Sequence, residues 1–138
     1  MSIGCRFLWG IFVVVVAAGT CWGSALYNII DLGTLGGPGG KAWDINNSGF
    51  VVGAAYTSEH VDHAVLWDTS FVPKDLGTLG GATSRAHALN DDGVIVGYAK
   101  NEEGASRAFV FEEGVMNDLG TLGGSSSVAW DINSKGNV

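Results

Sequence analysis

The chain has 138 residues, of which 14 are acidic and 7 are basic, so its formal net charge is −7. This acidic balance argues against nucleic-acid binding, because phosphate recognition needs a basic surface. The two cysteines, Cys5 and Cys21, both lie among the first 25 residues. The rest of the chain therefore contains no disulfide, and its fold must be held by strand pairing and apolar packing.

Residues 1–25 have the pattern of a secretory signal. Arg6 supplies the positive start, 7–18 is an apolar stretch, and Ala25 is a small residue suited to cleavage after it. An uncleaved membrane anchor is the alternative, because no charged residue follows Arg6 until Asp31. We expect export to the periplasm, the medium or the cell surface. Membrane contact would then come only through an uncleaved leader.

The heptad Asp-Leu-Gly-Thr-Leu-Gly-Gly occurs three times, starting at Asp31, Asp75 and Asp118. Its period is therefore 44 and then 43 residues, which indicates an array of stacked supersecondary modules. Within a repeat region 26–138, the units are 31–74, 75–117 and the partial unit 118–138. A residue that recurs in every unit is expected to be structural, and a functional one to break the pattern.

Each complete unit contains the same short apolar segments, bounded by turn-forming residues. They are 42–46, 50–53 and 63–67 in the first unit, and 86–90, 94–97 and 107–111 in the second. Short runs rich in Val, Ile, Trp and Phe predict strands, and about four strands per unit is the content of one propeller blade. The sequence therefore predicts an all-β chain of repeated antiparallel units of about 43–44 residues, arranged as propeller-like blades in an incomplete array.

Tight hairpin turns are predicted at 46–49 and 90–93, where asparagine begins the turn and glycine ends it. Along the preceding strand, alternation puts Trp43 on one face, and His87 and Trp130 occupy the same position in the other units. Because large side chains recur at this position, we expect them to be buried in the core of each blade. The alternative is a ligand platform for sugars formed by these aromatic residues.

Other candidate sites are weaker. His60, Asp62 and His63 form a compact cluster, but a tetrahedral metal site needs three or four convergent donors, and we expect a solvated loop. Asp44 and Asp131 recur as a carboxylate pair, yet the middle unit has alanine at that position. We therefore assign no catalytic residue, no cofactor-binding residue and no metal ligand.

The heptad, the Ala-x-x-Ile-Asn and Gly-x-Val-Val-Gly elements and a His-Ala-Phe-like segment together resemble the HAF repeat family of extracellular bacterial proteins. The resemblance covers about residues 27–138, although the tripeptide reads His-Ala-Val at 63–65 and Arg-Ala-Phe at 107–109. What the resemblance implies is a secreted, propeller-like β-repeat protein. The family brings no catalytic residues to this chain.

Residues 26–138 hold about two and a half units, whereas closed propellers have about four to eight blades. Three explanations stay open: a fragment of a longer repeat protein, a ring closed by several copies of the chain, and a small open β-structure. The expected function is a non-enzymatic scaffold for a surface partner, either a protein or a glycan. The alternatives are a fragment without independent activity and a hydrolase whose site spans the repeats.

Overall fold

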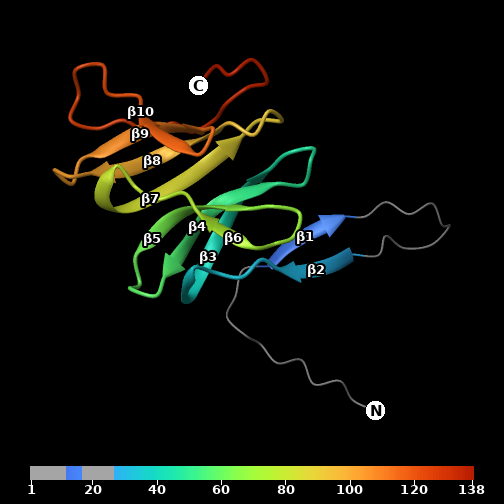
Figure 1. Cartoon of the computed structure of the whole chain (residues 1–138). Coiled ribbons are helices and arrows are strands. Elements are labelled where there is room, and N and C mark those ends of the chain that lie inside the picture. The colour runs from blue at the N-terminus through green and yellow to red at the C-terminus, as the bar shows by residue number, and fades with distance from the viewer. Residues whose placement is uncertain (1–11, 17–26) are drawn as a thin grey trace, which may run out of the picture.

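The computed structural model describes residues 12–16 and 27–138 (Figure 1). These residues form ten strands and no helix, which confirms the all-β prediction for the described part of the chain. Apart from the strand at 12–16, the predicted signal and its cleavage after Ala25 lie outside the described residues. Within those residues, no helix is long and apolar enough to cross a membrane.

The strands form three antiparallel sheets. β1 (Phe12–Val16), inside the predicted signal, pairs with β2 (Tyr27–Asp31). The first four-stranded sheet contains β3 (Gly36–Ile45), β4 (Val51–Thr57), β5 (Asp62–Trp67) and β6 (Pro73–Asp75). The second contains β7 (Gly80–Leu89), β8 (Ile95–Asn101), β9 (Ser106–Glu112) and β10 (Val115–Asp118). Each of these two sheets is a meander of one repeat unit.

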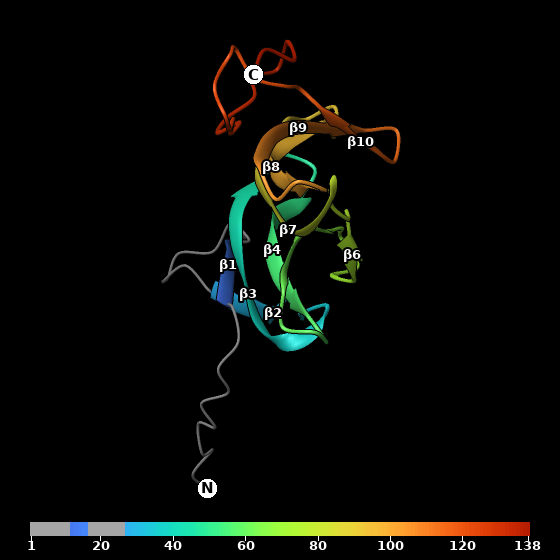
Figure 2. The same ribbon diagram turned by 90° about the vertical axis from the view of Figure 1, so that its left-hand side faces the viewer.

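The two four-stranded sheets are successive layers, and the segment after β10 lies beyond the second (Figures 1 and 2). They do not close into a ring.

The core consists of three buried clusters that alternate with the two four-stranded sheets. Each cluster takes residues from equivalent repeat positions. The cluster on the first sheet contains Leu32, Val51, Val65 and Trp67. The cluster between the sheets contains Val52, Ala64, Leu76, Ile95 and Phe109. The cluster beyond the second sheet contains Ala88, Val96, Ala108, Ala129 and Ile132.

The last glycine of Gly-x-Val-Val-Gly explains one repeated feature of the sequence. A Cβ atom at Gly53 would lie 1.9 Å from the carbonyl oxygen of Lys41, and one at Gly97 would lie 2.0 Å from that of Arg85. In both sheets the first strand has a bulge at this place, between Ala42 and Asp44 in the first unit. Only glycine allows the two backbones to approach so closely.

A buried serine joins the second unit to the first. The Ser84 hydroxyl accepts a hydrogen bond from the Ala64 N–H at 2.8 Å and donates one to the Gly77 carbonyl. Beside it, the Leu76 N–H donates to the Ala64 carbonyl at 2.9 Å. Ser127 repeats these contacts between the terminal segment and the second unit. The second heptad therefore attaches its own unit to the preceding sheet.

The predicted hairpin turns are confirmed, and they also connect the units. The Asn46 side-chain amide donates to the Asn90 carbonyl at 3.1 Å. The Asn47 N–H and side-chain amide donate to Asp91 at 3.0 and 2.7 Å, and these two bonds lower the pKa of the Asp91 carboxyl. Gly49 closes its turn with φ of 81°, where a residue with a side chain would be strained.

Candidate functional site

The structure brings the three predicted platform residues together in one row. Trp43 comes from β3, His87 from β7 and Trp130 from the terminal segment. The His87 ring stacks on Trp130 with centroids 4.4 Å apart and meets Trp43 edge-on at 5.5 Å. The row therefore runs across three successive units, one ring from each.

The predicted burial of these tryptophans is wrong. Trp43 is 41% exposed and Trp130 is 72% exposed. The opposite face of β7 is the packed one, and it presents the small side chains of Ala86 and Ala88. Ala129, next to Trp130 in the terminal segment, is buried too. Small residues let successive layers approach closely, so the large rings take the outer face. Trp67, at a different position of the first unit, is fully buried.

One ring nitrogen fixes His87 in the row. Its Nδ1 lies 2.9 Å from the Ala129 carbonyl oxygen, and because a carbonyl only accepts, Nδ1 carries the proton. Tyr98 flanks the same ring, with centroids 5.6 Å apart. His87 is thus held by a hydrogen bond and by aromatic neighbours, and it positions the exposed indole of Trp130.

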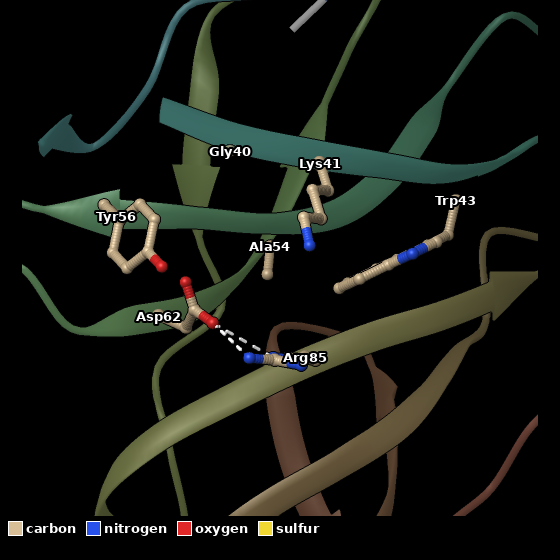
Figure 3. Close-up of a pocket in the computed structure, with 7 residues that line it drawn as sticks. All are labelled: Gly40, Lys41, Trp43, Ala54, Tyr56, Asp62 and Arg85. Carbon is tan, nitrogen blue, oxygen red and sulfur yellow. Dashed lines mark hydrogen bonds and ion pairs between the residues drawn. The ribbon is translucent and has the colours of Figure 1, made fainter. Parts of the chain in front are cut away.

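A cleft of about 310 Å³, its open mouth included, lies beside Trp43 at the junction of the first two units. Its polar and aromatic walls are formed by Lys41, Trp43, Tyr56, Asp62 and Arg85. Figure 3 shows the side chains of Lys41, Trp43 and Arg85 directed into the same space. Aromatic walls with a few convergent polar groups are typical of small-molecule sites.

An ion pair crosses the junction at the base of this cleft. Arg85 Nε donates to Asp62 Oδ2 at 3.1 Å, and Nη2 donates to the same oxygen. The Asp62 side chain is 17% exposed and that of Arg85 is 40% exposed. The more buried carboxylate therefore holds the guanidinium in place through Nε and Nη2, and Nη1 forms the outer edge of Arg85, away from these two bonds.

The sequence analysis did not assign the charged residues of the cleft. Lys41 and Arg85 occupy the same repeat position, each two residues before Trp43 or His87. Side chains two residues apart on a strand share a face, so each cation is expected on the same face as the aromatic ring that follows it. Applied to both units, this rule would have predicted that the two cations lie beside the aromatic row. Asp62 gave no comparable signal, because its partner lies on another unit.

The other candidate residues have separate contacts. Asp62 pairs with Arg85, whereas His63 Nδ1 lies 2.8 Å from Asp75 Oδ2. In residues 12–16 and 27–138, no three side chains of the types that bind metals come together. Asp44 accepts the Leu89 N–H at 3.0 Å and joins two units, which is a structural contact.

Comparisons with known proteins found no matching family model, no similar curated protein and no similar solved structure. The proposals below are therefore argued from the residues and their geometry.

Proposed function

We propose that this protein is an exported, non-enzymatic β-repeat scaffold that binds a glycan on its outer face. The observation that carries the proposal is the exposed row of Trp43, His87 and Trp130. Exposed indoles cost solvation energy in a free monomer, and grouped ones mark binding surfaces. The C–H groups of a sugar ring pack on the negative face of an aromatic ring, so a row of rings suits an extended chain of sugars.

The architecture in this proposal is a stack of propeller-like blades of the HAF type. Two features support it: each complete unit is a four-stranded antiparallel meander, and equivalent residues join one unit to the next. One ring per unit in the aromatic row follows from that repetition.

The glycan-binding proposal is tested with the purified full-length protein and a panel of neutral and acidic oligosaccharides, by calorimetry. Trp130→Ala should weaken binding by about 2- to 12-fold, as expected for the loss of one stacking contact. Tyr27→Ala is the matched control, since Tyr27 is an exposed aromatic residue on β2 outside the row. If no oligosaccharide binds, or if the two variants behave alike, the proposal fails.

Export is tested separately by the mass of the protein recovered from outside the cytoplasm. Cleavage after Ala25 gives a chain that starts at Leu26, and a large residue in Ala25→Phe should block this cleavage. Cleavage would also remove β1 and leave β2 without that partner. Recovery of the full-length mass from every compartment would contradict the predicted cleavage.

A further inference from the structure

The cleft beside Trp43 concentrates positive charge in an acidic protein. After residue 26 the chain has six basic residues: Lys41, Lys74, Arg85, Lys100, Arg107 and Lys135. Two of them, Lys41 and Arg85, line this one cleft, and the single acid there is Asp62. The cleft therefore has a local excess of one positive charge, against a net charge of −7 for the whole chain.

The two cations are available to a ligand in different ways. Arg85 directs Nε and Nη2 at one Asp62 oxygen, so its other amino group, Nη1, makes no hydrogen bond to the described residues. Lys41 is exposed and has no hydrogen-bonding or ion-pair partner in the described part of the chain. Of the other cations of the sheets, Lys100 Nζ donates to the Gly104 carbonyl and Arg107 to that of Ser125, and Lys74 Nζ lies 5.8 Å from the centroid of the Phe111 ring.

The aromatic walls define what kind of anion fits. Trp43 belongs to the aromatic row and also borders the cleft, so a sugar on its indole would place its substituents beside the two cations. A guanidinium edge and an ammonium together offer donors to the two oxygens of a carboxylate. The cleft is an open hollow, since its volume of about 310 Å³ includes the mouth, and it suits contact with one substituted sugar rather than with a folded partner.

We propose that the glycan bound by this protein is an acidic one, built from uronic acids. One sugar packs on Trp43, and its carboxylate lies between Lys41 and the outer edge of Arg85. The inference rests on the proposed glycan-binding function and adds the ligand class. The distant acidic residues do not prevent it, because charges beyond about 8–10 Å are largely screened at physiological ionic strength, whereas a contact pair in the cleft is not.

The test compares three uronate oligomers (galacturonate, mannuronate and glucuronate) with the same oligomers after reduction of each carboxylate to an alcohol. Calorimetry with the full-length protein should show at least one uronate binding about tenfold more tightly than its reduced form. Lys41→Gln should remove most of that difference, because it removes one of the two cations beside the carboxylate. Lys135→Gln is the matched control, since Lys135 is an exposed lysine in the terminal turn.

The outcomes separate the two proposals. Equal affinity for the uronate and its reduced form, or a Lys41→Gln variant that keeps the full difference, would overturn the acidic ligand and leave glycan binding standing. A sulfated oligomer that binds as tightly as the uronate would contradict recognition of a carboxylate. Binding of none of these oligomers would overturn both proposals.

Discussion

The first and second four-stranded sheets have the same strand order and equivalent bulges, yet they present different surfaces. Residues that build the fold are shared, as with Gly53 and Gly97. The ion pair of the charged cleft is not shared. The junction of the first two units has the Asp62–Arg85 pair, whereas the equivalent positions at the next junction are Ser106 and Val128. The shared glycines thus report the architecture, whereas the ion pair distinguishes one junction from the next.

The largest expected effect on stability comes from adding a methyl group where the backbones of two strands approach closely, a feature that both sheets share. Gly53→Ala places a methyl group against the Lys41 carbonyl, and the strands must separate. We expect the free energy of unfolding to fall by about 3 kcal/mol or more in urea titrations followed by circular dichroism.

Gly39→Ala is the matched control for this change. It lies on the same strand, β3, with no atom within 4 Å of the added carbon and no left-handed φ. Its effect should stay within about 0.5 kcal/mol. Equal losses in the two variants would show that the close approach does not hold the sheet together.

A smaller effect is expected at the serine that joins the units. Ser84→Ala leaves the Ala64 N–H without its acceptor in a buried place, which costs about 1–3 kcal/mol. Ser127→Ala removes the equivalent bond at the less buried outer junction and should cost less. Urea titrations of both variants measure the difference, and a larger loss for Ser127→Ala would reverse the proposed order of the two junctions.

The smallest effect concerns pH. Hydrogen bonds from Asn47 lower the pKa of Asp91 in the folded protein, so this carboxylate stabilises the fold above its unfolded pKa of about 3.9. The contribution is lost as the pH falls through the lower folded pKa. Between pH 6 and pH 3 the urea midpoint of the native protein should therefore fall more than that of Asp91→Asn. If the urea midpoints of the native protein and of Asp91→Asn fall equally with pH, the hydrogen bonds from Asn47 to the Asp91 carboxylate do not stabilise the fold.

The repeat pattern was sufficient to predict much of the fold. The short apolar segments predicted an all-β chain, and Asn46 with Gly49 predicted a turn that the structure contains. These features depend on local backbone chemistry, which neighbouring residues largely determine. Closure of the units into a propeller is a property of many units together, and the two described sheets form no ring.

The site was harder to predict, because both faces of β3 and β7 carry apolar side chains. Alternation separates Trp43 from Ala42 but does not say which face is buried. The small side chains decide it, since they allow the layers to pack closely. The Asp62–Arg85 pair joins residues 23 positions apart on different sheets, and only the stacking of the units brings them together.

The most direct test of the account measures stability and binding on one variant, Trp43→Ala, beside Trp67→Ala. Trp67 is fully buried, so its loss should cost about 3–5 kcal/mol of unfolding free energy. The account predicts that Trp43→Ala keeps the native urea midpoint and loses affinity for the uronate oligomer. A Trp43→Ala protein that unfolds as readily as Trp67→Ala, or that binds the oligomer as tightly as the native protein, would contradict it.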